Sequence, residues 1–489
     1  MPSSILMPSS IAQVIEVARQ AQRQWQKQMP KVRQRAIRQV AGLLAEEYAS
    51  LLPLIPRPNA SAADKIASEV FPLAEACRFT AAVSRRTLAP QTYSMREGAW
   101  WIGRVRVTVS AEPWGIVLIV APGNYPLFLP GVQAIQALAA GNAVLIKPAP
   151  GCQPLLARFK ELLIAAGVPT DLVHILPEEI AAGREAMQLG VDKVVATGSA
   201  ATGQAILHDL ATTLTPATLE LSGCDAIFVL PQAQIEQVVP ALIYALKLNG
   251  GATCIAPRRI FVTPAHRAEL AQALDEGLSD AGEPDAVVPP SVLEHALQVV
   301  GAALSEGAEI VHGKLPAKPA AGKMRPLVLQ SVTAKMAIAR TDLFAPIVSI
   351  IEVPDMQTAL AADRHCPYGL GAAIFGPRSL AEHWANEVNA GCVVINDAVV
   401  PTADPRVPFG GWGKSGWGLT RGREGLREMA RTKTTCTRLG NWKPHLDRSI
   451  SGNEVLMSSL LAVFHASSWR KRFQAMGRVL SQIRRPSPP

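Results

Sequence analysis

The stretch WGIVLIVAPGNYP, residues 114–126, decides the fold. An apolar run from Gly115 to Val120 ends in a break rich in proline and glycine, and no residue from 113 to 146 is charged. A helix that spans a membrane needs about 20 continuous apolar residues, whereas Pro122, Pro126 and Pro130 interrupt this segment. The stretch therefore predicts a strand, a loop, a helix and a second strand.

The apolar runs that follow indicate an α/β fold. Short apolar runs alternate with helical patterns from residue 114 onward, which is typical of a doubly wound parallel sheet. The first set is 115–120, 143–146, 193–196 and 226–230, and the second is 259–262, 347–353, 372–375 and 392–395. The second set predicts another α/β unit that begins near residue 225. Upstream, 11–50 and 60–88 have helical patterns, and 98–110 alternates like exposed hairpin strands.

Composition describes a globular protein of a reducing compartment. The 489 residues are 48% hydrophobic and 18% charged, which fits two or three domains. The seven cysteines are scattered, with neither a CxxC pair nor the spacing of zinc ligands, so no metal site is expected. Free thiols and the lack of a secretory pattern in residues 1–10 favour the cytoplasm.

The net charge of +9 is concentrated at the C-terminus. Residues 465–489 carry six Lys and Arg and no acid, which leaves +3 for the rest of the chain. The basic excess is therefore interpreted as a property of the tail, and no nucleic-acid partner is expected.

A strand-to-helix turn near residue 198 suits a phosphate. The run 193–196 leads into Thr197-Gly198-Ser199-Ala200-Ala201-Thr202-Gly203, where glycines let backbone amides approach a phosphate at a helix N-terminus. The spacing is not G-x-G-x-x-G, so a tight turn with Gly203 packed on the sheet explains it equally well. Lys147 ends a buried strand and favours the phosphate, since open α/β sheets bind ligands at the carboxyl ends of strands.

Three residues have the chemistry of carbonyl oxidation and thioester hydrolysis. Cys254 follows the small residues Gly-Gly-Ala-Thr, Glu220 lies between two leucines, and Asn124 lies in the proline-rich break. A thiol nucleophile, a carboxylate base and an amide donor can attack a carbonyl, hold the oxyanion and hydrolyse a thioester. Each residue alone also has a structural explanation, such as a buried thiol or a left-handed loop residue.

The motifs from residue 11 to 438 resemble the aldehyde dehydrogenase superfamily, and they run in the family's order. They are Pro122-Gly123-Asn124-Tyr125-Pro126, Lys147-Pro148, Thr197-Gly198-Ser199, Leu219-Glu220-Leu221, Cys254, Leu343-Phe344-Ala345-Pro346 and Pro408-Phe409-Gly410-Gly411, followed by Ser415-Gly416. The short N-terminus, the phrase Cys254-Ile255-Ala256-Pro257 and the C-terminal extension look most like the fatty-aldehyde branch.

This resemblance implies catalytic roles for the three residues. Cys254 would attack the aldehyde, and the Asn124 amide and the Cys254 backbone N–H would hold the oxyanion. Glu220 would then activate the water that releases the acid.

The resemblance also implies NAD or NADP as cofactor. Lys147 would contact the adenosine ribose, and Gly198, Ser199 and Gly203 the pyrophosphate. Asp342 stands where the family carries Glu for the nicotinamide ribose, and Phe344 would support the nicotinamide.

Four departures from the family pattern lie close to these residues. Gly123 replaces a Trp, Ser222-Gly223-Cys224 replaces Gly-Gly-Lys, Ala252 replaces a Gln, and Asp342 replaces the Glu. Pro150 stands where members that prefer NAD often carry an acid, so NADP remains open beside NAD.

The implied architecture is aldehyde dehydrogenase-like. A Rossmann-type NAD(P)-binding domain would comprise 1–94 and 113–224, and an α/β catalytic domain 225–430. A bridging oligomerisation hairpin and strand, 95–112 and 431–438, would form a homodimer or a dimer of dimers.

The C-terminal extension, 439–489, predicts a basic amphipathic helix. Its apolar stripe alternates with Arg and Lys, as in helices that lie on an anionic membrane surface; the stripe is Trp469, Phe473, Met476, Leu480 and Ile483. We interpret 456–489 either as a peripheral membrane contact or as a helix that packs on the enzyme body or a partner subunit.

The sequence thus predicts an NAD(P)-dependent enzyme that oxidises an aldehyde substrate. Two alternatives stay open. One is an acyl-thioester reductase or phosphorylating relative, in which CoA or phosphate resolves the thioester, although Glu220 serves hydrolysis. The other is a catalytically retired, membrane-associated scaffold, which the four departures favour and the intact Cys254, Glu220 and Asn124 oppose.

Overall fold

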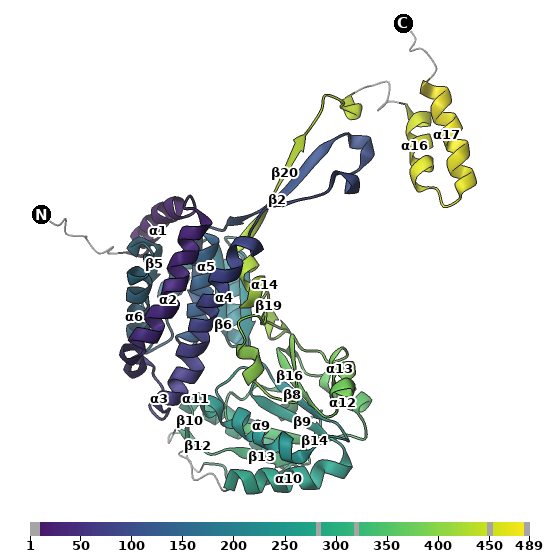
Figure 1. Ribbon diagram of the computed structural model, residues 1–489. Coiled ribbons are helices and arrows are strands. Elements are labelled where there is room, and N and C mark those ends of the chain that lie inside the picture. The colour runs from purple at the N-terminus through teal and green to yellow at the C-terminus, as the bar shows by residue number, and fades with distance from the viewer. Residues whose placement is uncertain (1–9, 280–284, 317–321, 447–452, 484–489) are drawn as a thin grey trace, which may run out of the picture. The chain divides into compact units, whose positions relative to one another are not determined.

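The chain is divided into two compact units. The computed structural model describes residues 10–279, 285–316, 322–446 and 453–483 (Figure 1). Met1–Leu88 and Glu112–Arg431 form the larger unit, and Ala89–Ala111 and Thr432–Pro489 form the smaller one.

The first sheet of the larger unit is doubly wound. Its six strands lie in the order β19 (Gly416–Trp417), β7 (Ala217–Leu221), β6 (Lys193–Gly198), β3 (Ile116–Val120), β4 (Ala143–Lys147) and β5 (Val173–Ile175). All neighbours are parallel except β19, which is antiparallel to β7. The strand order reverses between β3 and β6, and such a switch point opens a crevice at the carboxyl ends of the strands.

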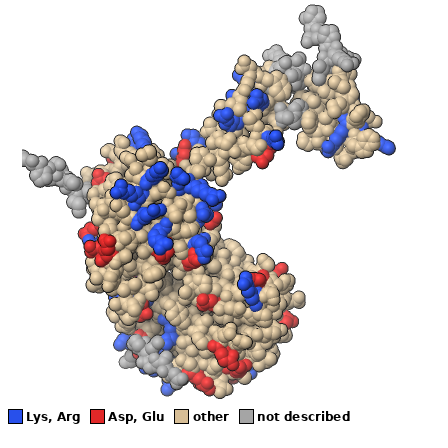
Figure 2. Space-filling view, viewed as in Figure 1, with Lys and Arg blue, Asp and Glu red and all other residues tan. Residues whose placement is uncertain are grey.

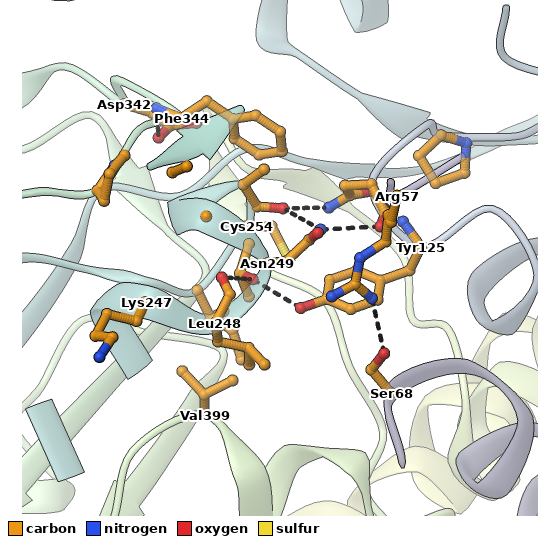
Figure 3. Close-up of a pocket in the computed structure, with 18 of the residues that line it drawn as sticks. Arg57, Ser68, Tyr125, Lys247, Leu248, Asn249, Cys254, Asp342, Phe344 and Val399 are labelled. Atoms are coloured by element: carbon orange, nitrogen blue, oxygen red, sulfur yellow. Dashed lines mark hydrogen bonds between the residues drawn. The ribbon is translucent and has the colours of Figure 1, made fainter. Parts of the chain in front are cut away.

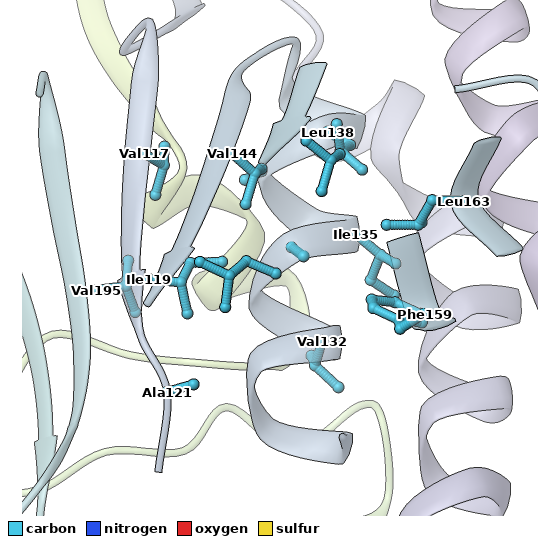
Figure 4. Packing of buried hydrophobic residues seen from close by; sticks show 14 of the residues in the cluster. Val117, Ile119, Ala121, Val132, Ile135, Leu138, Val144, Phe159, Leu163 and Val195 are labelled. Carbon is cyan, nitrogen blue, oxygen red and sulfur yellow. The ribbon is translucent and has the colours of Figure 1, made fainter. Parts of the chain in front are cut away.

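The uncharged segment 113–146 forms the centre of this sheet's core. It folds as β3, the break, α5 (Phe128–Ala140) and β4, which confirms the predicted order of strand, loop, helix and strand. Val117, Ile119 and Val144 face Ile135 and Leu138 of α5 (Figure 4). Among the described residues, no helix is both long and apolar enough to cross a membrane.

Helices cover the first sheet on both faces. The region 11–50, predicted to be helical, forms two helices, and 60–88 contains a short helix, a π turn at Ile66–Val70 and a longer helix. The helices are α1 (Ile11–Trp25), α2 (Pro30–Leu51), α3 (Ala62–Lys65), α4 (Phe71–Thr87), α5, α6 (Gln153–Ala165), α7 (Ile180–Gln188) and α8 (Ala200–Leu210).

A second sheet of seven strands follows. The order is β11 (Glu309–His312), β13 (Leu327–Gln330), β14 (Ile347–Glu352), β9 (Pro257–Val262), β8 (Asp225–Val229), β16 (Gly371–Phe375) and β17 (Cys392–Ile395). Only β11 is antiparallel to its neighbour. The run 226–230, grouped above with the first set, belongs here, because β8 pairs with β9 and β16.

The second sheet has its own helices and a few short ribbons. The helices are α9 (Ile235–Lys247), α10 (Pro264–Ser279), α11 (Pro290–Ser305), α12 (Met356–Asp363) and α13 (Arg378–Ala385), with α14 (Gly422–Glu428) near the end of the larger unit. The short pairs are β10 (Ala286–Val287) with β12 (Lys323–Met324), and β15 (Tyr368–Gly369) with β18 (Trp412–Gly413).

The smaller unit contains a three-stranded antiparallel ribbon. β2 (Val105–Pro113) lies between β1 (Gln91–Thr92) and β20 (Ala430–Arg438). The prediction of strand from residue 98 is wrong at its start, because Met95–Glu97 and Trp100–Ile102 form 3₁₀ turns. Gly103 has φ +80°, which interrupts the extended backbone before β2 begins.

The C-terminal extension forms a pair of helices. α16 (Glu454–His465) packs on α17 (Trp469–Ile483), and Ala475 and Val479 of α17 are buried. The predicted apolar stripe faces away from this contact, since Phe473 is 75% exposed and Trp469 72%. The Ile483 side chain and residues 484–489 lie outside the described part of the chain.

Basic residues also gather on the larger unit. Figure 2 shows Lys and Arg over the N-terminal helices α1, α2 and α4, and residues 11–38 contain seven Lys and Arg against one Glu. The interpretation that the basic excess is mainly a property of the tail was therefore incomplete.

Candidate active site

One open cleft of the larger unit brings most of the predicted site residues together (Figure 3). Its volume of 2020 Å³ exceeds the roughly 300–1,000 Å³ of an ordinary small-molecule pocket, which leaves room for a dinucleotide beside a substrate. Lys147 and Gly203 are not among the described residues that line it. The predicted residues that do line it are Asn124, Gly198, Ser199, Glu220, Cys254, Asp342 and Phe344.

Backbone geometry sets the position of Cys254. After α9 the chain passes through Asn249, Gly250 and Gly251, which all have positive φ. A Cβ at Gly251 would collide with the backbone of Ala345 and Pro346, so only glycine fits there. Cys254 follows this turn and is partly buried in the cleft.

A buried arginine fastens the cysteine loop to a neighbouring loop. The Arg258 guanidinium donates to the carbonyl oxygens of Gly251 and Ala345, both at 2.8 Å. Its Nε forms an ion pair of 3.2 Å with Asp342. The planar fork of arginine suits this set of acceptors in fixed directions. Arg258 therefore holds the turn before Cys254 against the segment that contains Phe344.

Hydrogen bonds join the Asn124 loop to the cysteine loop. The Asn124 side-chain amide donates to the Ala252 carbonyl at 3.1 Å, and the Asn249 amide donates to the Asn124 carbonyl at 2.9 Å. The Tyr125 and Thr253 hydroxyls are 2.7 Å apart. Since Thr253 precedes Cys254 in the chain, these bonds bring the amide donor and the thiol to one place (Figure 3).

A second buried carboxylate secures the other end of the Asn124 loop. Glu69 Oε2 accepts the backbone N–H groups of Leu127 at 3.1 Å and Phe128 at 2.8 Å, where α5 begins. Burial raises the Glu69 pKa to about 7, although these N–H groups and Arg57 oppose the rise. Arg57 also donates to Ser68 Oγ at 2.8 Å (Figure 3).

Glu220 and Cys254 interact directly in a poorly hydrated place. Glu220 lies on β7, and burial raises its pKa, while Arg421, the Cys254 thiol and Thr197 lower it. Glu220 Oε1 has no hydrogen-bond partner among the described residues. Burial also raises the Cys254 pKa, the negative charges of Glu220 and Asp225 add to the rise, and Arg421 opposes it. A carboxylate with a raised pKa is suited to act as a base near neutral pH.

The predicted phosphate turn lies at the carboxyl end of β6, beside the switch point. Gly198 ends this strand, and Ser199 caps α8 by accepting the Thr202 N–H at 3.1 Å. The helix N-terminus therefore faces the cleft, as an anion would require. Gly203 lies inside α8, where a Cβ would collide with Leu221, so its observed role is packing. Lys147 ends β4 with 8% exposure; contact of Lys147 or Gly203 with a cofactor stays a prediction.

Asp342 and Phe344 lie on one short loop. Asp342 Oδ1 accepts the Phe344 N–H at 3.0 Å as well as the Arg258 bond. Phe344 has φ +47°, an uncommon conformation for a bulky residue, which this bond supports. The predicted contact of Asp342 with a ribose stays a prediction, because the carboxylate already holds the loop.

A family model described as the aldehyde dehydrogenase family matches residues 6–435. The chain belongs to the aldehyde dehydrogenase family. The match covers both sheets and every site residue named above.

Individual relatives agree with this membership. The aldehyde dehydrogenase chain is 30% identical over 448 residues to a putative succinate-semialdehyde dehydrogenase [NADP(+)] of Mycobacterium ulcerans, which covers 88% of this chain and 86% of the relative. A crystal structure of a putative aldehyde dehydrogenase from Burkholderia cenocepacia superposes with a TM-score of 0.80 at 26% identity, over 88% and 92% of the two chains. An aldehyde dehydrogenase of Mycobacterium tuberculosis complexed with NAD+ has the same fold, with a TM-score of 0.79 at 22% identity over 89% and 92%.

Sequence reasoning missed several residues of this aldehyde dehydrogenase site. Arg258, Glu69, Asn249 and Arg421 each act through contacts between distant segments. Only Asn249 carried a local signal, because it opens the Gly-Gly turn. The other three are charged residues whose burial becomes visible only in the folded chain.

Replacing Glu69 should change how stability depends on pH. The folded-state pKa of about 7 lies above the model value of 4.5, so the favourable contribution is present below pH 4.5 and is lost as the pH rises towards 7. The loss amounts to on the order of 3 kcal/mol. Glu69→Gln keeps an acceptor for the two N–H groups but cannot ionise. The thermal midpoint of the wild type should therefore fall, relative to Glu69→Gln, between about pH 5 and pH 7.5.

Glu75→Gln is the matched control, because Glu75 lies on the same helical segment and is partly exposed. Its midpoint should follow that of the wild type. Parallel curves for wild type and Glu69→Gln would contradict the assignment.

Proposed function

We propose that this aldehyde dehydrogenase oxidises an aldehyde to a carboxylic acid with NAD or NADP, through a covalent intermediate on Cys254. The observation that carries the proposal is the direct interaction of the Cys254 thiol with the buried Glu220 carboxyl, beside the Asn124 amide. Nucleophile, base and amide donor come from three different segments and meet in one cleft.

In the first step the Cys254 thiolate attacks the carbonyl carbon and forms a thiohemiacetal. The oxyanion accepts hydrogen bonds from the Cys254 backbone N–H and from Asn124. Asn124 Nδ2 has two hydrogens, and only one is needed for the Ala252 carbonyl. Loss of one such donor typically costs about 3–4 kcal/mol of transition-state stabilisation.

The second step completes the oxidation. NAD or NADP would supply the hydride acceptor. When hydride leaves the substrate carbon, a thioester remains on Cys254. Glu220 then takes a proton from water, the resulting hydroxide attacks the thioester carbonyl, and the acid leaves as Cys254 regains its thiolate. The raised pKa of Glu220 suits this proton transfer.

The proposed cofactor site follows the switch point of the first sheet. Gly198, Ser199 and the start of α8 would hold the pyrophosphate, with Gly203 behind them, and Lys147 would approach the adenosine ribose. Asp342 and Phe344 would lie on the nicotinamide side. The name of the Mycobacterium ulcerans relative includes NADP(+), which supports NADP beside NAD.

Two other functions remain as outcomes of the test. In an acyl-thioester reductase or phosphorylating relative, CoA or phosphate would replace water. A retired scaffold would bind but not turn over. The buried Glu220 beside Cys254 favours hydrolysis over both. We further propose that 95–112 and 431–438 join subunits in a homodimer or a dimer of dimers.

Cys254→Ala should abolish formation of reduced cofactor from short, aromatic and long-chain aldehydes, measured by absorbance with NAD and with NADP. Loss of the nucleophile should lower the rate by several orders of magnitude. Cys436→Ala is the control, because Cys436 is an exposed thiol of the smaller unit, and its activity should equal the wild type.

Product formed only with added CoA or phosphate would favour the phosphorylating relative. No turnover of folded wild type with any pair would favour the scaffold. Equal activity of Cys254→Ala and wild type would contradict the mechanism.

We propose that the pair α16–α17 binds an anionic membrane surface, where apolar aldehydes partition. Trp469, Phe473, Met476 and Leu480 are exposed on one helix whose charged residues are all basic. Exposed apolar side chains between basic ones are typical of helices that lie in the interface plane.

Phe473→Glu should abolish most co-sedimentation with vesicles that contain phosphatidylserine. Gln474→Glu introduces the same charge at the next exposed position, so it controls for electrostatics. Zwitterionic vesicles and high salt should weaken wild-type binding. If deletion of residues 456–489 left vesicle binding unchanged, the membrane contact would be elsewhere.

A further inference from the structure

Arg421 has a strained backbone at the edge of the cleft. It precedes α14 with φ +62° and ψ 177°, a region that is almost restricted to glycine. The surrounding chain enforces it: Thr420 and Phe409 exchange two backbone bonds of 2.7 Å, and Gln136 donates to the Gly422 carbonyl at 3.0 Å. Strain of this kind persists where the structure over-determines it, often at functional sites.

The Arg421 side chain is buried without a conventional ion pair. It is 5% exposed, and its guanidinium carbon lies 4.2 Å from the Phe409 ring centroid and 5.7 Å from that of Phe128. Nη1 donates to the Thr402 carbonyl at 2.6 Å. Nε has no partner among the described residues, which also place no carboxylate within 4.0 Å.

A buried guanidinium needs negative charge nearby. Arginine keeps its charge in proteins, so it cannot avoid the cost of burial by losing a proton. The negative groups that act on Arg421 are Glu220, Cys254 and Cys392. The groups that act on Cys254 are Glu220, Asp225 and Arg421, of which only Arg421 is a cation. Arg421 and the two catalytic groups also line the same cleft.

We infer that Arg421 is the fixed positive charge that keeps the Cys254 thiolate and the Glu220 carboxylate ionised inside the cleft. It is a positioning residue, because it acts through Cys254 and Glu220. This inference rests on the proposed function only for the roles of those two groups.

Two features make Arg421 suitable for this task. Phe409, Phe128 and the Thr402 carbonyl fix the guanidinium, so the charge does not reorganise when the thiol ionises. Burial disfavours both anions, and Arg421 opposes this effect at each of them, lowering the pKa of Glu220 and the pKa of Cys254. Without it, two acidic groups in contact would share the cleft with Asp225 and no counter-charge.

The test is the pH dependence of Cys254 alkylation by iodoacetamide in the cofactor-free full chain, followed on the Cys254 peptide by mass spectrometry. Only the thiolate reacts. In Arg421→Leu and Arg421→Gln the midpoint should rise by at least about one pH unit, so the rate near neutral pH falls about tenfold. Arg421→Lys should keep most of the wild-type profile. Arg423→Leu, two residues along and outside the cleft lining, should leave the profile unchanged.

Thermal unfolding of each variant reports whether it folds, and Arg421→Gln serves if Arg421→Leu does not. Wild-type alkylation profiles in folded neutral variants would overturn the inference. Two contrary explanations can then be separated: a selective rise in KM for aldehydes that carry a carboxylate would make Arg421 a substrate receptor, and no kinetic change would make it structural. Alkylation needs no turnover, so a shifted midpoint in a protein that oxidises no aldehyde would retain the inference and reject the proposed function.

Discussion

Hydrogen bonds to backbone carbonyls hold the catalytic groups in register, and the rest of the site depends on them. The Asn124 loop follows β3 of the first sheet, whereas the Cys254 loop precedes β9 of the second. Asn124, Asn249 and Arg258 donate across these loops to carbonyls at 2.8–3.1 Å. Because the donors are mostly buried, water does not compete for these bonds. The thiol and the amide donor are therefore fixed relative to both sheets.

This arrangement places acidic groups where burial opposes their ionisation. Glu69, Glu220, Asp225 and Cys254 all have raised pKa values, and burial is the largest cause for each. Such a concentration of shifted groups in one cleft is more typical of catalysis than of structural ion pairs. The same burial that makes Glu220 a base near neutral pH also disfavours the thiolate. A fixed cation beside both groups resolves that conflict, and the structure places Arg421 there.

The sequence predicted the parts of the fold that local patterns determine. The uncharged segment 113–146 gave β3, α5 and β4, because proline and glycine mark the break between apolar runs. β7 was not predicted as a strand, since Thr218 and Glu220 interrupt its apolar pattern, although both are buried. The strand predicted from residue 98 starts only at Val105, after two 3₁₀ turns and Gly103.

The candidate site divides in the same way. Cys254, Glu220 and Asn124 could be proposed because a thiol in a small-residue turn, a lone acid and a loop amide are chemically suggestive as a set. Glu69, Arg258 and Arg421 could not, because a charged residue in a sequence is usually exposed. Their importance comes from the acceptors and rings that distant segments bring to them.

The central claim is that Glu220 activates the water that hydrolyses a thioester on Cys254. The most direct measurement is a single-turnover reaction of Glu220→Gln with an aldehyde and cofactor, with reduced cofactor followed by absorbance and the protein by intact mass. The account predicts a rapid burst of about one equivalent per site, and then a stall with the acyl group retained on Cys254. Steady turnover at the wild-type rate, with no acyl adduct, would contradict it.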